Sequence, residues 1–182
     1  KGLEGFVSDA AKRKGITDQV KTFLENRMVN IMTDQGFSRE AVNSALAASF
    51  DNIPDVHLRI KALDNLRKEP DFEPLAVTFK RVENIQKKAG DIVAMTVDPA
   101  LFEHAAEKNL FEACTSVTAA VLSLTEKGDY DGALKQIATL RPLVDSLFDD
   151  VMVFADDEAV KNNRIALLAS VSGLFKNIAD FS

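Results

Sequence analysis

The chain has 182 residues, of which 46% are apolar and 27% are charged, and its formal net charge at pH 7 is -6. This length and composition suit a globular protein with one substantial hydrophobic core. The acidic balance argues against a general nucleic-acid binder, which needs an excess of Lys and Arg. No apolar run approaches the roughly 20 residues of a membrane-spanning helix, and Cys114 has no disulfide partner, so we expect neither a membrane protein nor an oxidising compartment.

The first half of the chain predicts a lead-in followed by four helices. Residues 1–16 are mixed in character and interrupted by glycines, so we expect a linker or frayed segment there. Beyond it, apolar residues at helical spacing follow capping residues or prolines, and glycines stand where helices end. These signals predict helices that begin at Thr17 or Asp18, at Ser38, at Pro54 and at Leu75. The first of them ends at Gln35 and the fourth at Ala89.

The second half begins with a long predicted helix. Pro99 starts it, and we expect it to reach Lys127, because apolar residues between Leu110 and Leu124 recur at alternating spacings of four and three. A short helix around residues 133–138 follows. It ends before the Arg141-Pro142 pair, since proline removes a backbone donor and disfavours helical geometry in the residue before it.

The last two predicted helices are joined by a short apolar link, Met152 to Ala155. In the final helix Arg164 lies in the middle of the apolar face, at ~100° per residue. A guanidinium is costly to bury unpaired, so it needs a carboxylate opposite it. We therefore expect two antiparallel helices joined by an ion pair between Arg164 and an acidic residue of the preceding helix, namely Asp145, Asp149 or Asp150.

These elements predict an all-α bundle of about seven or eight helices with short connections. We expect two parts after the lead-in: an N-terminal helical subdomain over residues 17–97 and a C-terminal helical bundle over residues 98–182.

The sequence shows no catalytic constellation. His57 and His104 are far apart, and neither has a Cys or a second His beside it. One acidic cluster allows an Mg2+-dependent helical enzyme as an alternative: Asp149, Asp150, Asp156, Asp157 and Glu158. Helix capping and pairing with Arg164 account for these carboxylates better. We therefore expect neither catalytic residues nor metal ligands.

The predicted helix over residues 75–89 carries a basic face. Between Asp55 and Gly90 there are eight Lys or Arg against six Asp or Glu, a local balance of +2, so contact with a polyanion should be local. One polar face of the helix holds four cations around an amide: Lys80, Arg81, Asn84, Lys87 and Lys88. Such a face suits a phosphate backbone with a base edge between the cations. A solvated basic face without a ligand is the alternative.

Several stretches resemble a known family. They are FKRVENIQKKAG (79–90), GDYDGALKQIATLRPLVDSLFDDVMVFADDE (128–158) and NNRIALLASVSGLFKNIADFS (162–182). All three resemble the C-terminal region of the bacterial glycyl-tRNA synthetase beta-subunit family, and IKALDNLRKEPDFEPLA (60–76) resembles the segment just before it. The last three helices are similar to the DALR-type anticodon-binding domain, also found at the end of arginyl-tRNA synthetases, although only the Ala133-Leu134 pair of its four-letter signature is present.

This resemblance implies the anticodon-binding part of an alpha2beta2-type glycine–tRNA ligase in the bacterial cytoplasm. Its partners would be tRNA(Gly) and the alpha subunit, with no DNA and no membrane. In that family the alpha subunit performs the chemistry with ATP, glycine and Mg2+, so no cofactor is expected in this chain.

Two residues of the last helix are further candidates for RNA contact. Asn162 and Asn163 lie beside its apolar stripe and could reach a base edge, whereas Arg164 is expected to be structural. The alternative function is a helical protein–protein interaction module that docks a partner subunit through an apolar face.

Overall fold

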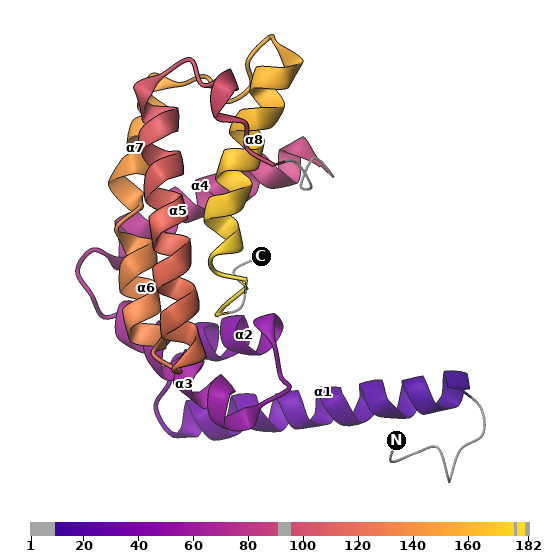
Figure 1. Cartoon of the computed structure of the whole chain (residues 1–182). Helices are drawn as coiled ribbons and strands as arrows, with labels where there is room; N and C mark the ends of the chain where they lie inside the picture. Colours follow the sequence, from indigo (N-terminus) through magenta and orange to yellow (C-terminus); the bar gives the residue numbers. More distant parts are fainter. Residues whose placement is uncertain (1–9, 91–95, 177, 181–182) are drawn as a thin grey trace.

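The computed structural model describes residues 10–90, 96–176 and 178–180 (Figure 1). Over these residues the regular structure is helical, without strands, so the predicted all-α fold is confirmed. No helix in this described part is long and apolar enough to cross a membrane. The helices are α1 (Ala10–Asp34), α2 (Arg39–Ala48), α3 (Ile53–Leu66), α4 (Phe72–Ala89), α5 (Ala105–Glu126), α6 (Tyr130–Ala138), α7 (Arg141–Asp150) and α8 (Glu158–Gly173), with a 3-10 turn, η2 (Pro99–Leu101), before α5.

Helix α5 is the long axis of the structure. Helices α6 and α7 pack along it, and α7 and α8 each contact both α5 and α4. At the other end, α3 packs on α6, α2 on α3 and α1 on α2, so that α1 projects sideways from the base of the bundle (Figure 1). Apart from Val160 and Ala166, the buried apolar side chains of the described residues form one core that runs from Met28 to Ala179.

Local sequence signals set many of the helix ends. The Ser38 hydroxyl accepts a hydrogen bond from the Ala41 backbone N–H at 3.3 Å and starts α2 as predicted. Gly36 and Gly90, which follow α1 and α4, have φ values of 94° and 69°. Glycine reaches this left-handed region without the steric cost that a Cβ imposes, so these two positions terminate their helices.

Two predicted helix starts are wrong by six residues or more, and α4 begins at Phe72, three residues before the predicted Leu75. Helix α1 begins at Ala10 rather than Thr17, because Ala and Lys are strong helix formers and continue the helix across Gly15. Residues 1–9 of the predicted lead-in lie outside the described part. The helix predicted from Pro99 is divided: the Asp98 carboxylate caps η2, the chain is extended at Phe102, and α5 begins only at Ala105.

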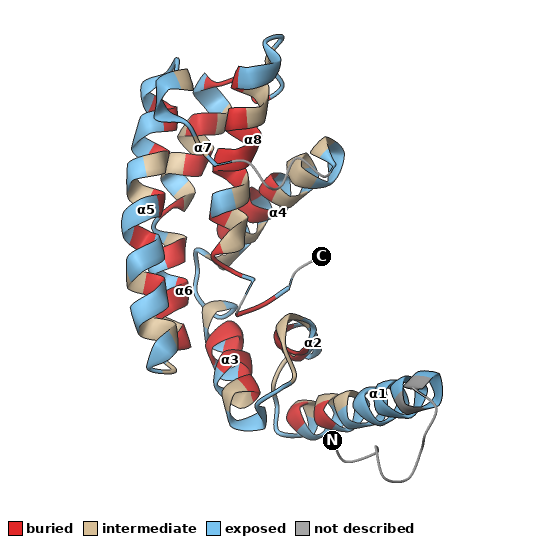
Figure 2. Ribbon diagram, turned by 45° about the vertical axis from the view of Figure 1, so that its right-hand side comes forward, coloured by how far each residue is buried: buried red, intermediate tan, exposed pale blue. Residues whose placement is uncertain are grey.

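Most of α1 is not covered by the other residues that the structure describes (Figure 2). Its Met28 and Met32 side chains are buried, and they lie at the end of the helix that contacts α2. Five other large apolar side chains of α1 are exposed: Ile16, Val20, Phe23, Leu24 and Ile31. Helical periodicity alone therefore identified an apolar face, but not what covers it.

The buried position of Arg164 is confirmed, but its predicted partners are wrong. Its Nε donates to Glu107 Oε1 at 2.8 Å and its Nη2 donates to Glu103 Oε2 at 2.7 Å. Its Nη1 donates to the carbonyl oxygen of Met152 at 3.1 Å. The guanidinium therefore joins α8 to the start of α5 and to the link that precedes α8.

The aspartates of α7 have other partners. Asp145 accepts a hydrogen bond from Thr78 Oγ1 at 2.7 Å and lies 3.3 Å from Arg141 Nε, while Asp150 accepts from Ser146. Asp149 is exposed. Because α7 and α8 both pack against α4 and α5, the acidic side of α7 does not meet the face of α8 that carries Arg164.

A second buried guanidinium holds the lower helices together. Arg59, fully buried on α3, donates to Asp55 and to the backbone carbonyls of Ala45 and Ser49 in and after α2. The Tyr130 hydroxyl at the start of α6 donates to the same Asp55 carboxylate. Burial and this carboxylate raise the pKa of Tyr130 to about 12. One network thus ties α2, α3 and α6.

Replacing Glu107 with Gln tests the buried pair with little change of shape. We expect E107Q to lower the free energy of unfolding by about 3–5 kcal/mol, because Arg164 loses the buried carboxylate that compensates its charge. Denaturant titration followed by circular dichroism measures this. The control is E103Q, because Glu103 is 57% exposed and screened by water. It should cost below about 1 kcal/mol, and equal losses in both variants would contradict the assignment.

The same pair predicts a pH dependence. Burial acts to raise the pKa of Glu107, but the Arg164 guanidinium and the backbone N–H groups of His104 and Glu103 outweigh it and lower that pKa. A carboxylate with a lowered folded pKa stabilises the fold above its unfolded pKa and loses that contribution as the pH falls. The parent should therefore lose stability below about pH 4.5, the ordinary Glu value, and E107Q should lack this part of the loss.

Candidate nucleic-acid interface

Helix α4 presents its charged residues to solvent on one face. Its buried side carries Leu75, Phe79 and Val82, which anchor it against the core. The opposite face exposes every residue of the predicted basic set: Lys80, Arg81, Asn84, Lys87 and Lys88. We call these five residues the cationic face. The two last-turn lysines also lie at the negative end of the helix dipole, which favours their charge.

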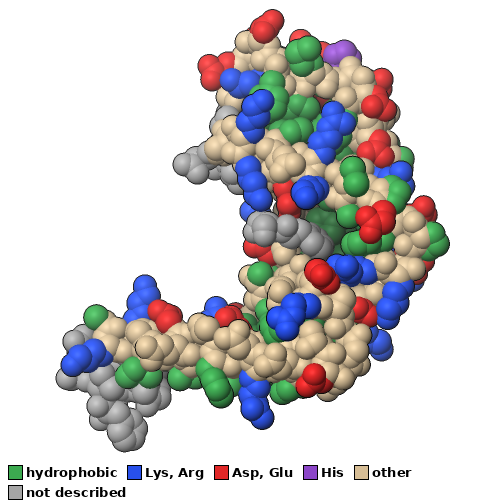
Figure 3. Space-filling view, turned by 180° about the vertical axis from the view of Figure 1, so that it is seen from behind, with side chains coloured by type: hydrophobic (Ala, Val, Ile, Leu, Met, Phe, Trp, Pro, Cys, Tyr) green, Lys and Arg blue, Asp and Glu red, His purple; other side chains and the backbone are tan. Residues whose placement is uncertain are grey.

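Two aromatic rings border the cationic face. The Arg81 guanidinium lies 4.0 Å from the centre of the Phe148 ring of α7, and the Lys88 ammonium lies 4.8 Å from that of Phe154. Phe154 is 36% exposed and the neighbouring Met152 is 76% exposed. Figure 3, viewed from behind, shows Lys and Arg side chains gathered around exposed hydrophobic ones on the upper part of the molecule.

The sequence prediction did not include these apolar neighbours. It treated residues 152–155 as a short apolar link. No local signal distinguishes a ring that packs inside from one that lies beside a cation on another helix. The packing of α7 against α4 brings Phe148 to Arg81, and the link after α7 brings Phe154 to Lys88.

The side chains of the cationic face and its two rings can contact phosphates, base edges and base planes. Lys and Arg neutralise phosphates, and an exposed amide both donates to and accepts from base edges. Aromatic and guanidinium planes stack on unpaired bases, which favours single-stranded nucleic acid over a closed duplex. The cationic face with its two rings therefore suits a nucleic-acid loop better than a solvated surface of lysines alone.

Residues 75–181 match the protein family described as the DALR anticodon binding domain. The chain belongs to this family. The match covers more than half of the chain and begins in α4, so it includes the cationic face. The predicted division at residues 97–98 assigns α4 to the N-terminal part instead.

Relatives of this DALR-domain chain carry one shared name. The glycine–tRNA ligase beta subunit of Desulforapulum autotrophicum is 56% identical over 182 residues, which is 100% of this chain and 26% of the relative. That of Desulfatibacillum aliphaticivorans is 47% identical over 168 residues, 91% of this chain and 24% of the relative. That of Geotalea uraniireducens is 47% identical over 180 residues, 99% of this chain and 25% of the relative. The chain spans about a quarter of these beta subunits, and the resemblance seen in the sequence is confirmed.

The two asparagines of α8 differ in the DALR-domain structure. Asn163 is 5% exposed; its Oδ1 accepts from the Asp98 N–H at 2.7 Å and its Nδ2 donates to the Asp98 carbonyl at 2.9 Å. The prediction that Asn163 contacts RNA is therefore wrong, because its amide anchors the segment before η2. Asn162 is half-buried, and contact between it and RNA stays a prediction.

The acidic cluster contributes to structure in this domain. Asp157 caps α8 by accepting from the Val160 N–H at 3.0 Å, and Glu158 lies 3.6 Å from Lys161. Within the described ranges no group of three or more His, Cys, Asp or Glu is arranged to hold a metal ion. Cys114 is buried near Ser170, and burial raises the pKa of its thiol.

Replacing Asn163 with Ala tests its assignment as a structural residue. We expect N163A to lower the free energy of unfolding by about 1–3 kcal/mol, because two backbone groups of Asp98 lose their buried partners. Asn162→Ala is the matched control, one residue along the same helix, and should have a smaller effect. Thermal or denaturant unfolding measures both. An N163A protein as stable as the parent, but weaker in binding RNA, would return Asn163 to the interface.

Proposed function

We propose that this chain recognises the anticodon loop of tRNA(Gly) as part of the beta subunit of a bacterial glycine–tRNA ligase. The observation that carries the proposal is the cationic face of α4 with its two aromatic neighbours, in a chain of the DALR anticodon-binding family. The relatives are named glycine–tRNA ligase beta subunits, and this shared name supports both the ligase activity and the choice of glycine in the proposal. In this role the chain supports glycyl-tRNA formation by an alpha and beta holoenzyme in the cytoplasm.

The physical basis is local electrostatics with stacking. Lys80, Lys87 and Lys88 contact backbone phosphates, Asn84 reaches between them to a base edge, and Phe154 offers a surface to an unpaired base. The whole chain is acidic, with a net charge of -6. Long-range attraction to RNA is therefore weak, and binding depends on close contacts that salt screens strongly.

In this proposal the catalytic reaction takes place on another subunit. Activation of glycine with ATP and Mg2+ takes place on the alpha subunit of an alpha2beta2-type enzyme, and this chain contributes recognition without a cofactor of its own. The beta-subunit names of the relatives support a partner subunit.

Removing charge from the cationic face should weaken tRNA binding. We expect the triple substitution Lys80→Ala, Arg81→Ala and Lys87→Ala to lower the affinity for a tRNA(Gly) anticodon stem-loop by roughly tenfold or more. The slope of log affinity against log salt should fall by roughly 0.7 for each phosphate that the variant no longer neutralises. Fluorescence anisotropy across a salt series measures both quantities.

A matched control removes the same charge from other exposed positions, through Lys61→Ala, Lys127→Ala and Lys135→Ala. Circular dichroism verifies that both triple variants stay folded. The control variant should bind like the parent. Equal weakening by the two triple variants would mean that net charge alone drives binding, and parental affinity in the cationic-face variant would contradict the proposed interface.

The exposed stripe of α1 supports a second candidate function, the docking of a partner subunit. Val20, Phe23 and Leu24 are all more than 40% exposed on a helix that projects from the bundle (Figure 1). Exposed apolar patches of this kind mark protein–protein contacts. We infer that the alpha subunit is the partner. Docking through α1 and RNA binding through α4 use separate surfaces, so one chain can do both.

Polar substitution on α1 tests this docking. We expect Val20→Ser with Phe23→Ser to weaken association with the alpha subunit by roughly tenfold or more, since burial of each apolar side chain contributes about 1.5–3 kcal/mol. Analytical ultracentrifugation of the mixed subunits measures association. The control is Val77→Ser with Leu122→Ser, which changes exposed apolar residues of α4 and α5. Unchanged association in the α1 variant would exclude this stripe as the docking surface.

A further inference from the structure

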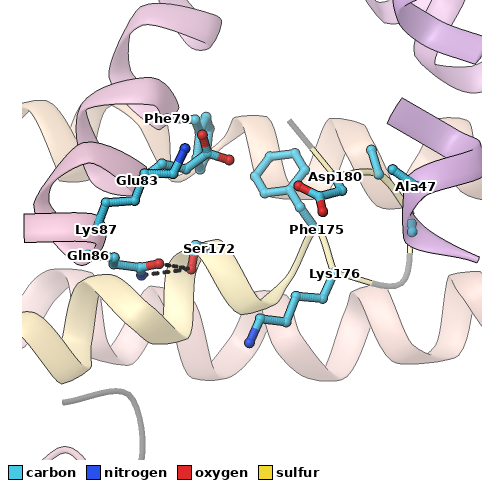
Figure 4. Close-up of a pocket in the computed structure, with 11 residues that line it drawn as sticks. Ala47, Phe79, Glu83, Gln86, Lys87, Ser172, Phe175, Lys176 and Asp180 are labelled. Atoms are coloured by element: carbon cyan, nitrogen blue, oxygen red, sulfur yellow. Dashed lines mark hydrogen bonds between the residues drawn. The ribbon is translucent and has the colours of Figure 1, made fainter. Parts of the chain in front are cut away.

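A groove runs along the other side of α4, away from the two aromatic rings. It lies between α4, the end of α8 with the turn after it, and α2, and it has a volume of about 410 Å3 (Figure 4). This falls within the roughly 300–1,000 Å3 of small-molecule sites. Phe79 and Phe175 form its apolar wall, with ring centres 4.6 Å apart and the rings inclined at 75°.

The polar groups of the groove have a fixed order along α4. Glu83 and Gln86 both line it, three residues apart and hence on the same side of the helix. Gln86 Nε2 donates to Ser172 Oγ at 2.7 Å, and Ser172 Oγ lies 3.0 Å from Gln86 Oε1 (Figure 4). This contact orients the amide, which still has capacity for a second donated and a second accepted bond.

Charged side chains of both signs line the groove. Lys87 and Lys176 line the groove and can contact phosphates. Burial raises the pKa of Glu83, Asp180 adds to that effect, and Lys87 and Lys80 oppose it. Glu83 is therefore a partly desolvated carboxylate near both lysines and Asp180, and partial burial makes its hydrogen bonds to a ligand stronger than in open water.

The Glu83 acceptor and the Gln86 donor together match one type of nucleobase edge. Cytosine and adenine each present an exocyclic amino donor beside a ring-nitrogen acceptor. Glu83 can accept from the amino group while the Gln86 amide donates to the ring nitrogen. Uracil presents an oxygen where cytosine has the amino group, which would face the Glu83 carboxylate with acceptor against acceptor. A guanine edge presents the same mismatch at its O6.

We propose that this groove binds an unpaired base of the RNA loop with the amino-and-ring-nitrogen edge shared by cytosine and adenine, read by Glu83 and Gln86. The inference rests on the proposed function and deepens it, since it adds base selection to backbone contact. The cationic face holds the phosphates, and the groove beside it receives the base. Glu83 and Gln86 are specificity-determining residues in this arrangement.

The experiment uses anticodon stem-loops that differ at one unpaired position at a time. Replacing cytosine with uracil changes the amino-and-ring-nitrogen edge with little change of size. Replacing adenine with hypoxanthine does the same for the purine. We expect the parent protein to lose roughly tenfold in affinity at one loop position, because the mismatched base leaves hydrogen-bonding groups of Glu83 and Gln86 without a partner. The position that responds, and whether it responds to the pyrimidine or the purine exchange, identifies the base.

Glu83→Gln then tests the role of the carboxylate. Glutamine keeps the shape but can donate as well as accept, so the preference at the responsive position should fall below roughly threefold. Glu112→Gln, which removes an exposed carboxylate from α5, is the control and should keep the parental preference. Melting temperatures verify that both variants are folded.

The outcomes separate this proposal from the broader one. If the parent shows no preference at any loop position, or if E83Q keeps the full preference, the base-reading groove is wrong. The cationic-face variant can still lose affinity in that case, which would leave anticodon-loop binding intact. If the parent does not bind the stem-loops at all, both proposals fall together.

Discussion

Glu107 and Arg164 form a buried ion pair in which both carboxylate oxygens have strong partners. One oxygen accepts from Arg164 Nε, and the other accepts from the backbone N–H groups of Glu103 and His104 at 2.8 Å each. The carboxylate thus satisfies the open amide groups at the start of α5 while it neutralises a guanidinium on α8. Two buried charges are tolerated here because each is hydrogen-bonded as well as paired.

This buried ion pair is also connected to residues at the surface. Arg164 also donates to the Met152 carbonyl, so it fixes the link between α7 and α8 from within. That link carries Phe154 to its place beside Lys88 of α4. Helix α4 lies against both α7 and α8, with aromatic rings on one side and the groove on the other. A structural ion pair in the core is therefore connected, through Met152 and the link, to the aromatic side of the proposed RNA-binding surface.

An acidic chain with a basic patch is well suited to selective recognition. Uniform positive charge would bind any RNA, since phosphate contacts carry no sequence information. Here four cations gather on one face of α4, beside rings that stack on unpaired bases and a groove that offers an ordered acceptor and donor. Affinity and selection then come from neighbouring but distinct groups on α4. Membership of the DALR anticodon-binding family is consistent with this division of labour.

The sequence alone determined the all-α fold, most helix ends and the exposed basic face of α4, because periodicity, capping and glycine positions act within a few residues of the chain. It also placed Arg164 on a buried face. Only the tertiary structure decided that its partner is Glu107, 57 residues earlier, and not an aspartate of the preceding helix. The tertiary structure also decided that the Asn163 amide is buried against Asp98 and that Phe154 lies beside Lys88. Such contacts depend on which helix faces meet, and local sequence pattern does not specify how helices pack across long separations.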